Sequence, residues 1–572
     1  MNLKIIGLLL PVGLAACAQV PAKTEVKVDK PEEQVVARQP ILPEQELTQL
    51  MLFDFLLGET ALQRGRPEIA VSTYLGLAKS TRDPRVAQRA TDVALHSRQP
   101  AAALEAATIW LELDPDSIIA RQTVAALLVN AGRLDDARPH LERLLASEGN
   151  NISAAFMQLN NLLARHANKA ATLALVQQLA QPYPKLAESH FAVAQAAWLA
   201  NQLDVALTEV RQAATLRPDW ELAAIYQGQI LQRTSGASAL EFYEGFLKTY
   251  PKARDVRLNY ARTLVAEKKF SQARSQFQKL LEEHPANADV ALAVGLLSME
   301  LRDFDIAETN FKKVLELGYK DTGTVRYYLA RIYEDTGRIA AAMEWYRSVA
   351  DGDQYLPAQT KYAGLLAKQG KMDEARKYLQ QLPATNNQQR AQLILAEAQL
   401  LREAGAHREV FELLGSGLEK LPNYPDLLYD RALAAEKIGK TTIMEQDLRK
   451  LIQLKPDYAH AYNALGYNFA DRGSRLPEAL DLIEKAIKLA PDDPHILDSL
   501  GWVHYRMGNL KEGLKYLNQA YASRPDPEIA AHLGEVLWMQ GAKEEAKKVW
   551  QAALKSNPDN EVLLKTIKKF MP

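Results

Sequence analysis

The chain has 572 residues, of which 47% are hydrophobic, and its 69 Lys and Arg nearly balance its 70 Asp and Glu. This balance leaves no basic stripe of the kind that binds nucleic acid, so we expect no nucleic-acid partner. A single hydrophobic core stops growing near ~250–300 residues, so a chain of this length either splits into domains or is built from repeats.

The first residues have the pattern of a secretory signal. A basic start at residues 1–4 precedes an apolar stretch at 5–13 that is too short to span a bilayer. Residues 14–17, Leu-Ala-Ala-Cys, resemble the lipobox of bacterial lipoproteins. The resemblance implies a signal peptide over 1–16 and lipidation of Cys17. Because Ala18 follows instead of aspartate, it also implies an outer-membrane anchor facing the periplasm. A non-lipidated signal that contains cysteine by chance is the alternative.

Residues 17–44 are expected to form a lipidated, disordered tether. They mix Lys, Glu, Gln and Val with four prolines and show no helical period. A flexible chain of this length has an end-to-end distance of roughly 28 Å. Cys17 is the only cysteine of the chain, so an internal disulfide is excluded.

A ladder of small residues begins after the tether and runs to the end of the chain. It has fifteen positions, twelve of them alanine, separated by 33 to 35 residues. A fixed period of this length is typical of repeat architectures. The ladder comprises Ala70, Ala103, Ala137, Ala171, Ala206, Ala239, Ala273, Ala307, Ala342, Ala375, Val410, Met444, Ala479, Gly513 and Ala546.

A second column of small residues lies 12 positions before the ladder. Two helices packed as a hairpin need small residues where their axes come closest, so the two columns predict the contact between helix A and helix B of each unit. The second column comprises Gly58, Ala125, Ala194, Ala261, Gly295, Ala330, Ala363, Ala398, Ala432, Gly501 and Gly534.

Glycine and proline mark the turns between these helices. Glycine five positions before the ladder predicts a left-handed residue that ends helix A, and proline 12 positions after the ladder predicts the end of helix B. The glycines are Gly65, Gly132, Gly337, Gly370, Gly405, Gly439, Gly508 and Gly541. The prolines are Pro115, Pro218, Pro251, Pro285, Pro422, Pro456, Pro491, Pro525 and Pro558.

The C-terminal units resemble the tetratricopeptide repeat most closely. Residues 462–467, Tyr-Asn-Ala-Leu-Gly-Tyr, and 497–502, Leu-Asp-Ser-Leu-Gly-Trp, match the W-x2-L-G-x2-Y pattern of that family. We expect an all-α, superhelical tetratricopeptide-repeat solenoid of about 14–15 helical hairpins over 45–558. The units near 150–180 and 383–415 lack a proline in the usual place and are interpreted as decayed repeats.

The last segment, 559–572, is expected to be a capping helix. Residues 565–570 are locally basic, which fits a solvated cap; a contact with a membrane surface or a phosphate group is the alternative.

No motif for catalysis stands out. The ten histidines form no HExxH or other metal-ligand spacing, and there is no GxSxG elbow, Walker loop or GxGxxG. The Asp-Gly-Asp at 351–353 lacks the remaining ligands of a calcium loop and is expected to be a turn. We therefore expect neither an enzyme nor a metal, cofactor or small-molecule substrate.

The helix A positions that face the groove in tetratricopeptide proteins are the candidate partner-binding residues. Aromatic side chains ringed by polar groups are typical of peptide-binding surfaces, although Trp502 and Trp538 can equally well fill space inside the solenoid. Acidic Asp498 and Glu528 argue against a clamp for a carboxylate here and favour an internal or basic segment. The predicted groove comprises His460, Asn463, Tyr467, Asp471, His495, Asp498, Trp502, Tyr505, Arg506, Glu528, Glu535 and Trp538.

The whole chain resembles the LbcA-type outer-membrane lipoproteins. The matching residues are Arg-Asp-Pro-Arg at 82–85 and the stretch from Ala464 to Gly534. The resemblance implies a non-catalytic adaptor that binds a periplasmic carboxyl-terminal processing protease and its cell-wall hydrolase substrates. A scaffold in envelope assembly is the alternative: a secretin pilotin, a component of outer-membrane protein assembly or one of polysaccharide export.

Overall fold

The computed structural model describes residues 42–163 and 166–571. These residues form α-helices and one short 3-10 helix, with no strand among them, which confirms the all-α prediction. They divide into two compact units, 1–318 and 319–572, and each unit is described on its own. The signal peptide, Cys17 and most of the tether lie outside the described residues and stay predictions.

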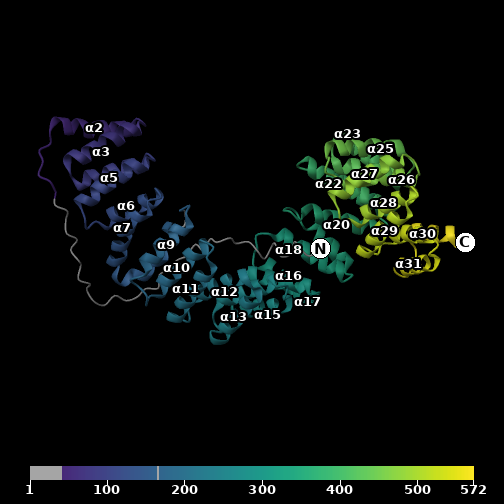
Figure 1. Cartoon of the computed structure of the whole chain (residues 1–572), viewed down its shortest axis with the longest axis horizontal. Helices are drawn as coiled ribbons and strands as arrows, with labels where there is room; N and C mark the ends of the chain where they lie inside the picture. The colour runs from purple at the N-terminus through teal and green to yellow at the C-terminus, as the bar shows by residue number, and fades with distance from the viewer. Residues whose placement is uncertain (1–41, 164–165, 572) are drawn as a thin grey trace. The chain divides into compact units, whose positions relative to one another are not determined.

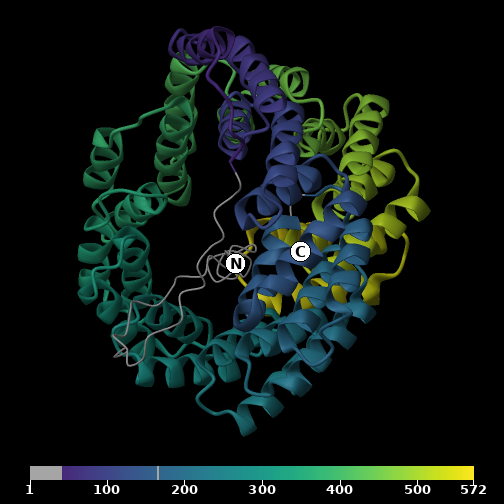
Figure 2. The same ribbon diagram turned by 90° about the vertical axis from the view of Figure 1, so that its left-hand side faces the viewer.

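The first unit is a row of helical hairpins that follow one another in chain order (Figures 1 and 2). Even-numbered helices are the A helices of the hairpins and odd-numbered helices are the B helices. The unit contains α2 (Gln49–Gln63), α3 (Pro67–Thr81), α4 (Pro84–His96), α5 (Pro100–Leu113), α6 (Ile118–Asn130), α7 (Leu134–Ser147), η1 (Gly149–Asn151), α8 (Ile152–Leu163), α9 (Lys169–Ala180), α10 (Ala187–Leu199), α11 (Leu203–Leu216), α12 (Glu221–Thr234), α13 (Gly236–Thr249), α14 (Arg254–Ala266), α15 (Phe270–Glu283), α16 (Ala288–Glu300) and α17 (Phe304–Glu316).

The second unit continues the same alternation and adds one helix after its last hairpin. It contains α18 (Thr322–Asp335), α19 (Ile339–Arg347), α20 (Tyr355–Lys368), α21 (Met372–Gln381), α22 (Asn387–Glu403), α23 (His407–Lys420), α24 (Pro425–Lys437), α25 (Thr441–Leu454), α26 (Ala459–Asp471), α27 (Leu476–Leu489), α28 (Pro494–Arg506), α29 (Leu510–Ser523), α30 (Pro527–Met539), α31 (Lys543–Ser556) and α32 (Glu561–Phe570).

The two small columns meet where each A helix crosses its B helix. Every ladder residue except Ala171 is buried. At α28 and α29 the approach is close enough that a Cβ on Gly501 would lie 2.9 Å from the carbonyl oxygen of Gly513, and one on Gly513 would lie 3.0 Å from that of Gly501. Backbone meets backbone at this crossing, so only the smallest side chains fit.

The turn inside most hairpins uses a left-handed residue, as predicted, but the α12–α13 turn passes through Ser235 with an extended φ of −157°. All eight glycines of that column have φ between 65° and 95°. Four hairpins of the first unit place a non-glycine residue there, namely Arg98, Asn201, Lys268 and Arg302, with φ of 56° to 59°. Their turns keep the same backbone hydrogen bonds: Lys268 N donates to Val265 O and Lys269 N to Leu264 O. The turn geometry is therefore retained without glycine, at a conformational cost.

The prolines end the B helices as predicted. Each of the nine B helices followed by a proline of the column ends two residues before it; α23, for example, ends at Lys420 before Pro422. The residue between helix and proline leaves the helical conformation, because the ring of the following proline disfavours it; Leu421, for example, has φ −132° and ψ 69°.

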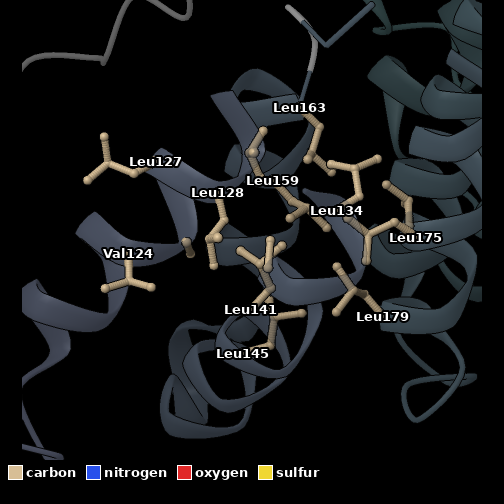
Figure 3. Close-up of a cluster of buried hydrophobic side chains, with 14 of the residues drawn as sticks. Val124, Leu127, Leu128, Leu134, Leu141, Leu145, Leu159, Leu163, Leu175 and Leu179 are labelled. Atoms are coloured by element: carbon tan, nitrogen blue, oxygen red, sulfur yellow. The ribbon is translucent and has the colours of Figure 1, made fainter. Parts of the chain in front are cut away.

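Leucines and valines from consecutive helices build the core between hairpins. In Figure 3, Val124 and Leu128 of α6 face Leu141 of α7, and Leu159 and Leu175 from the next hairpin, α8 and α9, join them. This hairpin lies in the region of weak repeats near 150–180, and α22 and α23 lie in the other such region. Both regions keep the helix pair.

Candidate partner-binding surfaces

The twelve predicted groove residues lie on three A helices, α26, α28 and α30, but they differ widely in exposure. Four remain exposed: His460, Asp471, His495 and Glu528. Asp498, Trp502 and Glu535 are buried, with 5–7% of their surface exposed. The other five, Asn463, Tyr467, Tyr505, Arg506 and Trp538, are half-buried. The face is thus a packed interior with an exposed rim.

His532 of α30 links the three helices and was not among the predicted residues. Its Nδ1 lies 2.9 Å from Asp498 Oδ2, and its Nε2 lies 3.2 Å from the Tyr467 hydroxyl. The Trp502 ring stacks on it at 4.2 Å between centroids. Burial is the largest single influence and disfavours the imidazolium, but the carboxylates of Asp498, Asp471 and Glu535, led by Asp498, together raise the pKa of His532. We call Tyr467, Asp498, Trp502 and His532 the groove cluster.

Glu535 joins the groove cluster to the last helix of the chain. Its Oε1 accepts hydrogen bonds from the Tyr505 hydroxyl at 3.2 Å and from Lys569 Nζ, on α32, at 2.9 Å. Burial and the nearby Glu535 carboxylate together raise the pKa of Tyr505 to about 12. The buried carboxylate is therefore compensated from two helices.

Trp538 is a packing residue in this arrangement. Its ring stacks on Trp550 of α31 at 5.8 Å between centroids and contacts Phe570 of α32 at 6.0 Å. Trp502 and Trp538 therefore fill space inside the solenoid. The surface that a partner can contact consists of His460, Asp471, His495 and Glu528. The exposed part of the rim is acidic through Asp471 and Glu528.

A second surface lies on α2, the first described helix. Leu50, Phe53 and Leu56 are 60–71% exposed and Leu57 is 37% exposed. We call these four residues the α2 face. Asp54 lies among them and makes no ion pair with any described residue.

The same positions are buried in later A helices. Residues at the position of Phe53, such as Val256, Ile496 and Ile529, are fully buried, and Val256 and Ile496 belong to core clusters that include residues of the preceding hairpin. No described residue takes that place on α2. At the other terminus, α32 buries Leu563 and packs Ile567 and Phe570 against the last hairpin. The α2 face is thus a repeat-packing surface on which no preceding hairpin of the described residues packs.

Two kinds of feature are absent from residues 42–163 and 166–571. Within them, no group of His, Cys, Asp and Glu has the arrangement of a metal site. Among the same residues, no helix combines the length and apolar character that a membrane span needs.

Comparison with known proteins agrees with this geometry. The tetratricopeptide repeat matches residues 231–297, 292–357, 429–494 and 499–561. A TPR repeat-containing protein of Pseudomonas aeruginosa, PA4667, is 33% identical over 475 residues, which cover 83% of this chain and 80% of that protein. The chain belongs to the tetratricopeptide repeat family. Proteins of this family are generally non-catalytic and mediate protein–protein interaction.

Other proteins are similar to the chain at lower identity. The human mitochondrial import receptor subunit TOM70 is 21% identical over 228 residues, or 37% of each protein. Among solved structures, a thermophilic tetratricopeptide protein of Thermus thermophilus is 22% identical with a TM-score of 0.30, and covers 33% of this chain and all of its own. The Cut9–Hcn1 hetero-tetramer of the APC/C is 16% identical with a TM-score of 0.29, and covers 85% of this chain and 96% of its own.

Proposed function

We propose that this tetratricopeptide protein is a lipid-anchored adaptor on the periplasmic side of the outer membrane. In this role it binds a carboxyl-terminal processing protease and brings cell-wall hydrolases to it. The α2 face carries the binding part of the proposal, because it exposes residues that the fold buries in later repeats. The anchor rests on the lipobox-like residues 14–17, and the class of partner rests on the resemblance to LbcA-type lipoproteins.

The α2 face also limits what binds to it. Its leucines and Phe53 match an apolar ridge of another helix, since that is what the equivalent positions contact in the later repeats. Asp54 in the middle of the face has no cation of a described residue paired with it, so a Lys or Arg on the partner's ridge would be favoured. The partner segment expected here is an amphipathic helix with one central basic residue.

The acidic rim of α26–α30 is a second contact for the same assembly. Asp471 and Glu528 project beside His460 and His495, which leaves the rim suited to a basic segment of a partner. Two separate contacts on one chain raise the effective concentration of a bound substrate near a bound protease.

Site-specific crosslinking in cells tests the proposal. A photo-crosslinking amino acid replaces Phe53 on the α2 face, His495 on the rim or, as the control, Gln519, which is exposed on the B helix α29. Crosslinks to a processing protease and cell-wall hydrolases from Phe53 or His495, and not from Gln519, support the adaptor. Crosslinks to secretin or barrel-assembly subunits support the envelope-assembly alternative instead. The same pattern from all three positions would refute a specific role for both surfaces.

The anchor has its own test. With Cys17→Ser, we expect an uncleaved precursor that incorporates no radiolabelled palmitate. Normal cleavage and fractionation of this variant with the outer membrane would contradict the lipoprotein assignment and leave the binding surfaces untouched.

A further inference from the structure

The hairpin of α20 and α21 has a shortened B helix. The proline that ends a B helix normally lies 12 residues after the ladder position, but Pro383 lies only 8 residues after Ala375. Accordingly, α21 has 10 residues whereas α23 has 14, so its last turn is missing. The next A helix, α22, has 17 residues, whereas α24 has 13.

A cleft opens where the missing turn would lie. It has a volume of about 480 Å³ and is bounded by the end of α21, by α22 from Arg390 to Glu397 and by the end of α23. Its apolar lining includes Leu379, Leu382, Leu393, Ile394 and Leu413. This volume lies in the range of ligand pockets, about 300–1,000 Å³. The B helices contribute two of its walls, so it is separate from the α26–α30 groove.

Two cationic side chains line this cleft, and neither has an acidic partner among the described residues. Arg390 and Lys420 are both exposed lining residues, and neither forms an ion pair with a described residue. The only hydrogen bond found for the Arg390 guanidinium within the described chain goes to the Asn387 side chain at 3.4 Å. Two unpaired cations beside an apolar lining favour a ligand that joins an anionic group to an apolar group.

A buried carboxylate completes the polar pattern. Glu397 has 4% of its side chain exposed and lines the cleft. Its Oε1 accepts hydrogen bonds from Arg376 Nε at 2.9 Å and Gln380 Nε2 at 2.8 Å. No hydrogen bond from a described residue reaches its second oxygen, Oε2. This oxygen is an acceptor for an N–H group of a ligand.

We propose that this cleft binds the free C-terminal end of a peptide whose last residue is apolar. The last side chain enters the leucine-lined space, its carboxylate pairs with Arg390 and Lys420, and a backbone N–H donates to Glu397. A fatty acid offers the anion and the apolar chain but no donor for Glu397. An internal peptide segment offers the donor but no carboxylate. The site shares no residue with the α2 face or the rim, so it stands independently of the adaptor proposal.

Fluorescence anisotropy of the full chain tests this site. The probe is a fluorescein-labelled peptide ending in Ser-Ala-Leu-Leu with a free carboxylate, and the matched probe ends in a carboxamide. We expect the amide to bind at least about tenfold more weakly, because a charge-assisted hydrogen bond is lost. Equal binding of the two peptides would overturn the proposal, as would the absence of binding by either.

Substitutions inside and outside the cleft show where the peptide binds and whether the change of net charge alone weakens binding. Arg390→Glu with Lys420→Glu is expected to abolish binding, and Arg408→Glu with Lys455→Glu, which makes the same charge change outside the cleft, is expected to retain it. Ser416→Trp obstructs the cleft without changing charge and is expected to weaken binding to the same degree. Retained binding in both cleft variants would place the site elsewhere.

A competitor identifies the ligand class. Dodecanoate displaces the peptide only weakly if Glu397 selects a peptide N–H. If dodecanoate competes as well as the unlabelled peptide, the cleft is a fatty-acid site and the peptide assignment is wrong. Circular dichroism spectra that match the parent chain establish that each variant is folded.

Discussion

Replacing Gly501 with alanine tests whether the crossing of A and B helices requires the absence of a side chain. The added Cβ would lie 2.6 Å from Leu517 Cγ, 2.9 Å from Gly513 O and 3.0 Å from Leu517 N. Two of these three atoms belong to the backbone of α29, so relief requires the helices to separate. Overpacking of this kind costs about 1–3 kcal/mol, and the better helix propensity of alanine returns about 1 kcal/mol. We expect a net loss of up to about 2 kcal/mol.

The matched control is Gly364→Ala in α20 of the same unit. A Cβ at Gly364 would meet nothing within 4 Å, so alanine gains its propensity without a clash and is expected to stabilise by about 0.5–1 kcal/mol. Hydrogen exchange of the amides in α28–α29 and in α20 measures both effects locally, because repeat arrays do not unfold in one step. If both substitutions changed amide protection relative to the parent chain in the same direction and by the same amount, the steric account of the small columns would be refuted.

Three further outcomes follow from single contacts. Lys268→Gly should stabilise by about 0.5–1 kcal/mol in thermal melts, since it removes a left-handed side chain; a lower melting temperature would contradict this. Hydrogen bonding to Arg475 lowers the pKa of Glu445 to about 2 from 4.5, so this contact stabilises fully above about pH 4.5 and its contribution is lost as pH falls towards 2. In Arg475→Ala, urea titrations across that window should show a shallower loss. Asp498→Asn should lower the pKa of His532 in NMR titrations, and an unchanged pKa would mean that Asp498 is not the dominant charge.

Much of the fold was predictable because each repeat carries its own steric signals. Alanine and glycine mark helix crossings, and proline ends helices, by local rules that need no knowledge of distant residues. The turns at Lys268 and Arg302 carry no such local signal, since packing of the flanking helices imposes the left-handed backbone. Their position five residues before the ladder is what would have revealed them.

The candidate surfaces were harder to predict, because burial depends on neighbours one repeat away. Trp502 is of a residue type that is common at binding surfaces, but the stacked His532 ring covers it. His532 lies 34 residues after Asp498, one full period, so aligning the repeats would have paired these two residues. Phe53 is exposed because no described hairpin packs on α2 from the N-terminal side, and this has no signature within the helix itself.

The sliding boundary between α21 and α22 shows how a repeat protein can diversify without losing its periodicity. The B helix α21 is four residues shorter than α23 and the A helix α22 is four residues longer than α24, while the ladder continues from Ala375 to Val410 within its usual spacing. The neighbouring hairpins keep their contacts, since the number of residues per repeat is conserved. Moving one proline by a helical turn therefore creates a cleft in one hairpin and leaves the others unchanged. The same shift in any other repeat of this chain would create a cleft there.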